Sequence, residues 1–267
     1  MDRCRLKNVI ILILLLVNVF LLSSMAYRST AARNAWERRV EQLVELFAAD
    51  GVELDPDAVS RDTPPAGCVL TRDTSLERSA ASYLLGGGLI HSERGGVYTY
   101  SGSNGAALFR ENGGFEAAGT LAASNGERFC EMFCREFHYA VVSTQIDADG
   151  SGTITALREY GGLTVFNCSV TFTLDQGAVT AAGGTLLPES FTESAETEFL
   201  SAPAALTAFQ SMRHESGAVA SSIGEMYLCY ELQSSTAAPM SLAPAWCIVT
   251  DAVNYYVNCV TGAVVQG

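Results

Sequence analysis

The segment from Asp147 to Ile154 carries the residue types that bind calcium in EF-hand loops. Asp147, Asp149 and Ser151 occupy the first, third and fifth positions of such a loop, and each side chain offers an oxygen ligand. An EF-hand loop has a bidentate glutamate at its twelfth position, where this chain has Arg158, whose positive charge opposes a cation. The flanking residues also favour strands over helices, so we expect a hairpin turn here, with calcium binding as the alternative.

Cysteine pairs are the second group of residues that could bind a metal. Cys130 and Cys134 are four residues apart on a predicted helix and are therefore neighbours on its surface. Apart from His138, no cysteine or histidine with the spacing of a zinc site lies nearby. We expect these two thiols to pack in the core, and we predict no metal and no cofactor.

Cys247 and Cys259 flank a predicted hairpin near the end of the chain. The two would face each other, and could form a disulfide, if Asp251 lay opposite Tyr255. A shift of the strand register by one residue would remove that pairing. The sequence therefore leaves open whether these cysteines are bridged or free.

No pattern typical of an enzyme is present. The chain has three histidines, His91, His138 and His214, and none accompanies a Ser, Cys or acid in the spacing of a known nucleophile site. The motifs G-x-S-x-G and H-E-x-x-H do not occur, and the glycines at 86–88 lack the lysine of a phosphate-binding loop. We predict a non-catalytic protein, and a hydrolase is the remaining enzymatic alternative.

The charge of the chain argues against nucleic acid as a partner. The chain has 16 basic and 29 acidic residues, which gives a net charge of −13. Seven basic and two acidic residues lie at or before Arg39, so nine basic and 27 acidic residues follow, and that part carries −18. A surface with this charge repels phosphate backbones. We favour solubility as the role of the charge, with cations or basic partners as the alternative.

Residues 9–22 form an almost entirely apolar stretch, VIILILLLVNVFLL, which Asn18 alone interrupts. Extended to 9–27, the stretch reaches the length of about 20 residues that a membrane-spanning helix needs. Three basic residues precede it, and basic flanks stay in the cytoplasm. We therefore expect a single-pass protein of the cell membrane, with residues 1–8 in the cytoplasm and the main domain outside the cell.

Two questions about this stretch stay open. The segment from Ser24 to Ala26 resembles a cleavage site, so the stretch could be a secretory signal that is removed, although we favour a retained anchor. Asn18 could donate a hydrogen bond to another helix within the membrane, or it could be a tolerated polar residue near the interface.

Apolar residues recur at helical spacing in three later segments, 33–49, 127–137 and 204–212. Short apolar runs separated by turn residues predict antiparallel strands elsewhere. A helix followed by paired strands occurs at 127–187 and again at 203–267, which suggests a repeat. The predicted segments are a cytoplasmic tail (1–8), a transmembrane anchor (9–27), an N-terminal lobe outside the membrane (28–126), a helix-plus-sheet repeat (127–187), a connection (188–202) and a C-terminal helix-plus-sheet repeat (203–267).

These segments predict an α+β fold. An N-terminal transmembrane helix would be followed by curved antiparallel sheets, and a helix would cross each sheet on one face.

Two ends of the chain carry specific motifs. The N-terminal motif begins with Met-Asp and basic residues. It continues into an apolar stretch that contains an asparagine, Asn18, shortly before its end. The second has Pro-Ala-Trp at 244–246, Tyr-Val-Asn at 256–258 and Thr-Gly at 261–262. Both resemble the YycI family, which comprises accessory proteins of the WalK (YycG) sensor histidine kinase in Gram-positive bacteria. The C-terminal motif and the segment YGGLTVFNCSVTF also resemble YycH and PepSY-like modules, so the resemblance implies tandem PepSY-like repeats.

The resemblance also implies a regulatory function. A protein of this kind would pair with a YycH-like protein through its outer domain, and its membrane helix would contact the sensor histidine kinase and bias it between two states. The alternative is an exported PepSY-like module that binds or inhibits a cell-envelope peptidase or binds a cell-wall ligand.

Overall fold

The computed structural model describes all residues except 1–2, 195–197 and 236–237. The helices are α1 (Arg3–Ala49), the 3-10 helix η1 (Pro56–Ala58), α2 (Thr74–Leu85), α3 (Gly126–Glu136) and α4 (Ala202–Ser216). The strands are β1 (Glu53–Leu54), β2 (Cys68–Leu70), β3 (Ile90–Arg94), β4 (Val97–Gly102), β5 (Gly105–Phe109), β6 (Gly114–Ala122), β7 (Tyr139–Ile146), β8 (Gly152–Tyr160), β9 (Leu163–Asp175), β10 (Ala178–Thr185), β11 (Phe191–Glu193), β12 (Ser222–Ser235), β13 (Ala238–Thr250), β14 (Asn254–Asn258) and β15 (Val264–Gln266). Helices α2 and α4 are each followed by four strands, and α3 is followed by five.

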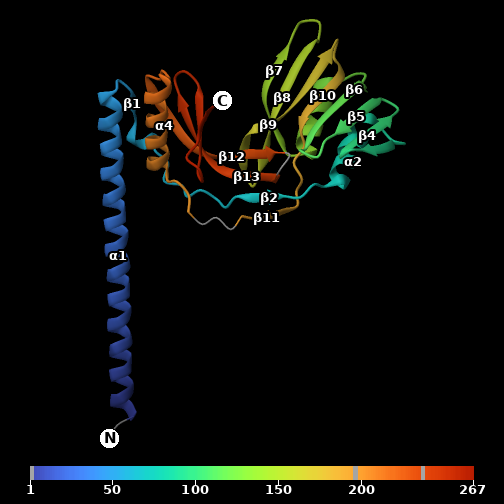
Figure 1. Ribbon diagram of the computed structural model, residues 1–267. Helices are drawn as coiled ribbons and strands as arrows, with labels where there is room; N and C mark the ends of the chain where they lie inside the picture. Colours follow the sequence, from blue (N-terminus) through green and yellow to red (C-terminus); the bar gives the residue numbers. More distant parts are fainter. Residues whose placement is uncertain (1–2, 195–197, 236–237) are drawn as a thin grey trace.

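All 15 strands join in one hydrogen-bonded network. Its broad half has the strand order β3-β4-β5-β6-β10-β9-β8-β7, and α2 and α3 pack on one face of it. In the other half, β13 pairs with β12, β2 and β14. The halves meet where β9 runs parallel to β12, with Val165 opposite Tyr230. Figure 1 shows β12 and β13 between α4 and the broad half.

This architecture corrects the predicted fold class. We expected an α+β arrangement of separate curved sheets, each crossed by its own helix, whereas the structure is a mixed α/β fold with one large, mostly antiparallel sheet. The strands merge because β6 and β10 pair with each other, with Ala118 opposite Ala181 and Ala117 opposite Ala182. Pairing of these strands removes two open sheet edges that separate sheets would expose.

Helix α1 corrects the prediction for the N-terminal segment. The helix is 47 residues long and runs without a break through residue 27 into a charged segment. Within the described part of the chain, no helix combines the length and the apolarity that a membrane crossing requires. The predicted anchor at 9–27 and the predicted single-pass location in the cell membrane are therefore not supported. Asn18, for which we expected a contact within the membrane, is exposed on this helix.

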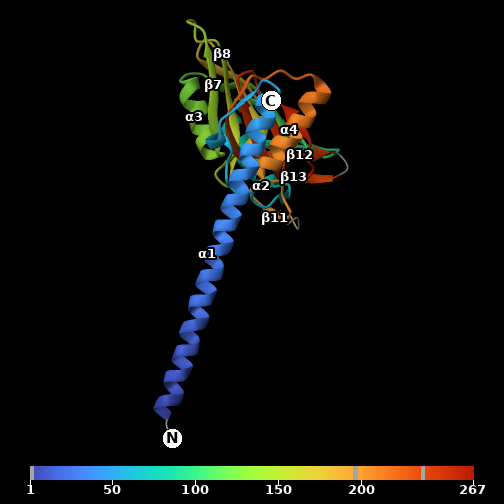
Figure 2. The same cartoon turned by 90° about the vertical axis from the view of Figure 1, so that its left-hand side faces the viewer.

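The last turns of α1 pack against the body of the protein, and the rest of the helix extends away from it (Figures 1 and 2). Val40, Leu43 and Phe47 recur at helical spacing and are buried. The ring of Phe47 stacks on that of Phe209 in α4, with 6.3 Å between the ring centroids. The predicted helix over 33–49 and its inward face are therefore confirmed.

Two further helix predictions are confirmed, because α3 covers most of 127–137 and α4 covers 204–212. Helix α2 was missed, since we expected only strands and turns in this glycine-rich region. Local signals for it are present in the sequence. The side chain of Asp73 accepts hydrogen bonds from the backbone of the first turn, and Gly86 ends the helix with a positive φ of 79°.

Gly105 of β5 and Gly119 of β6 let these two strands approach closely. The two residues pair, and their φ angles of +149° and +146° lie in a region that other residues rarely adopt. A Cβ atom on Gly119 would overlap the backbone carbonyl of Asn104 on the neighbouring chain segment. Glycine is therefore required at this crossing of the two strands.

The substitution Gly119→Ala is expected to lower the free energy of unfolding by about 2 kcal/mol or more, because the backbone must shift to admit the methyl group. Gly224→Ala in β12 is the control, since a Cβ atom there meets nothing within 4 Å. The control should change the free energy of unfolding by about 0.5 kcal/mol or less. Urea unfolding followed by circular dichroism measures both, and equal effects would contradict the close approach.

Candidate functional site

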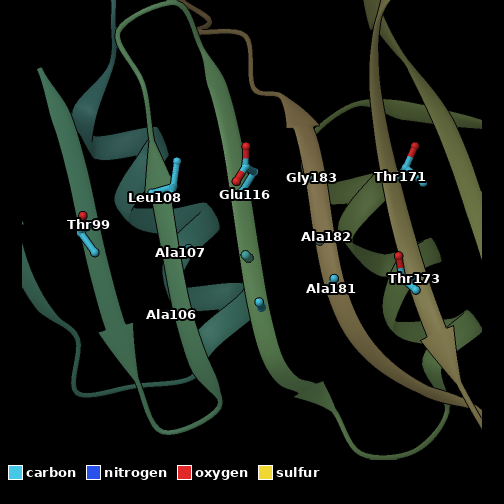
Figure 3. Close-up of a pocket in the computed structure, with 12 residues that line it drawn as sticks. Thr99, Ala106, Ala107, Leu108, Glu116, Thr171, Thr173, Ala181, Ala182 and Gly183 are labelled. Carbon is cyan, nitrogen blue, oxygen red and sulfur yellow. The ribbon is translucent and has the colours of Figure 1, made fainter.

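The two faces of the broad half of the sheet carry different side chains. The face under α2 and α3 holds an aromatic core around Phe133, whose ring centroid lies 5.3 Å from that of Phe172 and 6.4 Å from that of Phe115. Figure 3 shows the opposite face, with the helices behind the strands. Because successive side chains on a strand point to opposite faces, every second residue of these strands meets solvent on this uncovered face.

Small side chains leave a hollow of about 600 Å³ on the uncovered face, which we call the open-face hollow (Figure 3). It is lined by residues of β4, β5, β6, β10 and β9: Thr99, Ala106, Ala107, Leu108, Glu116, Ala117, Ala118, Thr171, Thr173, Ala181, Ala182 and Gly183. Most of these residues present methyl groups or backbone. The hollow therefore has an apolar surface with a few hydroxyl groups at its sides.

The lining of the hollow contains few polar groups. Glu116 is the one ionisable side chain among the described residues that line it. Its carboxylate accepts a hydrogen bond from Arg110 at 2.8 Å, and both side chains are exposed. Thr171 forms a hydroxyl–hydroxyl contact of 3.3 Å with Thr155. A single exposed carboxylate held by a guanidinium offers no partner for general acid–base or nucleophilic chemistry.

Sequence analysis did not identify this hollow. The signal that could have found it is the composition of three neighbouring strands, which have alanine or glycine on both faces, as in Gly-Ala-Ala at 105–107 and Ala-Ala-Gly-Gly at 181–184. A strand with small residues on both faces packs a helix on one side and leaves space on the other. That these three strands lie side by side was not visible in the sequence.

The calcium candidates Asp147, Asp149 and Ser151 lie in the β7–β8 turn, and their polar groups are used by the turn itself. A side-chain oxygen of Asp149 accepts a hydrogen bond from the amide of Ser151 at 2.9 Å. The hydroxyl of Ser151 in turn lies 3.4 Å from the carboxylate of Asp175 in the next hairpin. In the described part of the chain, no group of three His, Cys, Asp or Glu side chains could hold a metal ion.

Arg158, which opposes calcium in the sequence pattern, has a structural role. Its side chain is only 3% exposed and donates hydrogen bonds to the carbonyl oxygens of Phe137 at 2.6 Å and His138 at 2.9 Å. These carbonyls lie at the C-terminal end of α3, where the helix dipole places negative partial charge. The buried guanidinium therefore satisfies and neutralises the end of this helix.

The substitution Arg158→Met is expected to lower the free energy of unfolding by about 2–3 kcal/mol, because the buried carbonyl oxygen of Phe137 loses its donor and that of His138 keeps only the amide of Glu159. Arg33→Met is the control, since Arg33 makes a surface ion pair with Glu37 and is 69% exposed. The control substitution should lower the free energy of unfolding by at most about 1 kcal/mol. Urea unfolding measures both changes, and a loss in Arg158→Met no larger than in the control would contradict the capping role.

The register of the C-terminal hairpin differs from the one that a disulfide requires. Asp251 does not lie opposite Tyr255; instead Cys247 lies opposite Tyr256 in the β13–β14 pair. Cys247 and Cys259 are therefore not cross-strand neighbours, and both are buried free thiols. The same is true of the other cysteines from residue 68 onward, so the described part of the chain holds seven buried free thiols.

Burial makes these thiols unreactive. Removal from water, with a smaller contribution from the nearby Cys134, raises the pKa of Cys130 to about 12. Burial likewise raises the pKa of Cys259 to about 12. At neutral pH these groups are protonated and are neither nucleophiles nor metal ligands.

The raised thiol pKa values predict a loss of stability at alkaline pH. Below the usual cysteine pKa of 9.0, Cys130 is protonated in both states and its contribution to stability is fully present. Between pH 9 and about 12 the unfolded state loses this proton first, so the free energy of unfolding falls by about 1.4 kcal/mol per pH unit for each such thiol. Urea unfolding at pH 8, 9.5 and 11 should show a shallower decline in Cys130→Ala, and an unchanged slope would contradict the assignment.

The three histidines are dispersed over the structure. His214 Nε2 lies 2.7 Å from a carboxylate oxygen of Asp50, and this contact connects α4 to the residue that follows α1. His138 Nε2 lies 3.4 Å from Glu189, and His91 is exposed on β3. The structure brings none of them to the open-face hollow.

Comparison with known proteins gives little further information. No family model and no curated protein matches the chain. An uncharacterised protein from Eubacterium rectale has a similar crystal structure at 12% identity and a TM-score of 0.45, over 80% of this chain and 85% of that chain. The Bacillus megaterium YpeB C-terminal domain is similar at 12% identity and a TM-score of 0.38, over 74% of this chain and 98% of that chain. The second is a weak structural similarity to a PepSY-containing domain and does not single out the YycI family. Neither similarity is close enough to support an argument about function.

Proposed function

We propose that this chain is a non-catalytic binding protein, and that its open-face hollow holds an apolar part of a partner protein. The observation that carries the proposal is the hollow itself, about 600 Å³ of space between small side chains on an uncovered sheet face. Small-molecule and cofactor sites of proteins have volumes of about 300–1,000 Å³ and are mostly apolar with a few polar groups, and a cluster of apolar side chains of a partner needs a site of the same kind. The open-face hollow matches this description.

The residues around the hollow suit a side-chain cluster of a protein partner. Ala106, Ala118 and Ala181 admit bulky apolar groups close to the strands, and Leu108 adds apolar contact at one side. The hydroxyl of Thr173 is exposed and could form a hydrogen bond at the rim. The charge of −18 after Arg39 favours a partner that is neutral or basic around its apolar part.

Two classes of partner follow from the sequence resemblance. The first is a sensor histidine kinase together with a YycH-like protein, whose activity the bound chain would regulate through its folded domain. The second is a peptidase, which a PepSY-like module would bind or inhibit. Both functions need binding without catalysis, which is what the chemistry of the hollow supports.

A photo-crosslinking residue at Ala106 tests this proposal in cells that produce the protein. We expect crosslinks from position 106 to one discrete protein, because a docked partner covers this position. Thr192 on β11 is the control position, since it is exposed and does not line the hollow. Crosslinks of equal yield from both positions, or none from position 106, would overturn the proposal.

Filling the hollow provides the second part of the test. Ala118→Trp should reduce the crosslink from position 106 at least tenfold, because the indole occupies the space of the partner's side chains. The side chain of Ala118 is exposed, so circular dichroism should show a folded protein. Identification of the crosslinked protein by mass spectrometry then separates the kinase from the peptidase.

A further inference from the structure

The two outer edges of the broad half of the sheet differ in their protection. Among the described residues, β3 pairs only with β4, and β7 pairs only with β8. Edge strand β3 has five residues and carries His91, Glu93 and Arg94, and charges on an edge discourage the addition of another strand. Edge strand β7 has eight residues without a charge, and Val141 and Val142 are 45% and 55% exposed. The β7 edge is therefore long, β-branched and unprotected.

A bulge re-aims the side chains of β7. The pairing with β8 passes from Val141 opposite Ala156 to Ser143 opposite Thr155, so Val142 is an extra residue. Bulges occur next to functional sites, where they turn a side chain toward its target. Here the bulge presents two successive valines at the edge, and the strand continues for four residues beyond it.

A second hollow lies beside this edge, between α3 and the start of β7, and we call it the α3–β7 hollow. It has a volume of about 380 Å³, and Val141 of the edge strand lines it. Glu131 and Glu159 contribute two carboxylates, and Arg135 contributes one guanidinium. His138 also lines it and lies 3.4 Å from Glu189, which is a further carboxylate near the hollow. The side chains in and beside the α3–β7 hollow therefore carry a net negative charge.

We propose that β7 is a docking edge for an extended basic segment of another protein. The segment adds to the sheet as a further strand, its backbone pairs with the free side of β7, and one lysine or arginine side chain enters the α3–β7 hollow. Strand addition of this kind obtains affinity from backbone hydrogen bonds and specificity from pockets for alternate side chains. The β7 edge supplies the backbone groups for these hydrogen bonds, and the α3–β7 hollow supplies a pocket for a side chain.

Charge complementarity favours a basic segment over a second copy of this chain. Two copies that met at their β7 edges would bring together two bodies with −18 each after Arg39, and they would place Glu131 and Glu159 of both copies near each other. A basic strand gains attraction from the same charges. This proposal is independent of the open-face hollow, because no residue lines both places.

A fluorescein-labelled eight-residue peptide of alternating valine and lysine is a suitable probe with the full-length chain. We expect saturable binding by fluorescence anisotropy, and at least tenfold weaker binding of a valine–glutamate peptide. The double variant Val141→Lys/Val142→Lys should weaken binding of the valine–lysine peptide at least tenfold. Ile90→Lys on β3 is the matched control, because Ile90 is 76% exposed on the other edge, and it should change the affinity less than twofold.

Two further measurements distinguish strand addition from general attraction between charges. A valine–lysine peptide with N-methylated backbone amides on its pairing side should bind at least tenfold more weakly, because it cannot donate to β7. Glu131→Gln/Glu159→Gln should weaken binding of the unmodified peptide at least fivefold. The proposal is overturned if the methylated peptide binds equally, if the β3 and β7 variants behave alike, or if no saturable binding occurs. Dimerisation in sedimentation experiments that the β7 variant abolishes would also overturn it, in favour of a second copy.

Discussion

Coverage of one face of an eight-stranded sheet by only two helices is the constraint on which the rest of this structure depends. Helices α2 and α3 have 12 and 11 residues, so large aromatic side chains must fill the space beneath them. Phe133 lies at the centre of that core, and the hydroxyl of Tyr83 in α2 donates to a backbone carbonyl of α3 at 3.0 Å. Because both helices lie on the same face, the opposite face must remain stable in contact with water.

The uncovered face meets this requirement with small and β-branched residues. Alanine and glycine expose little apolar area, and threonine combines strand propensity with a hydroxyl group. The open-face hollow is a consequence of this composition at the point where β6 and β10 pair. The small residues that suit this face to water thus also create the hollow in which we propose that a partner binds.

A second core joins α1, α4 and the C-terminal strands. Trp246 is fully buried there, and its indole nitrogen donates to the carbonyl of Leu200 at 2.9 Å. Most of the ionisable groups of the protein remain on the surface, in turns or in helix caps, and the buried thiols are held in their protonated form. The molecule therefore offers shape, charge and strand edges to its surroundings, and the binding role that we propose rests on these three properties.

The sequence by itself determined what depends on neighbouring residues. Apolar spacing predicted the helices over 33–49, 127–137 and 204–212. The same local signals were sufficient for α2, because Asp73 and Gly86 mark its ends, but the surrounding glycines obscured them. Composition also showed that the chain after Arg39 is strongly acidic.

The tertiary structure decided what depends on distant residues. It placed β6 beside β10 and so merged sheets that we had predicted as separate, and it set the register that separates Cys247 from Cys259. It also turned Arg158 toward the end of α3 and left the β7 edge open. The physical reason is that strand pairing has a side-chain period of two, so alternative partners and registers satisfy the same local pattern. Only the packing of the whole chain selects among them.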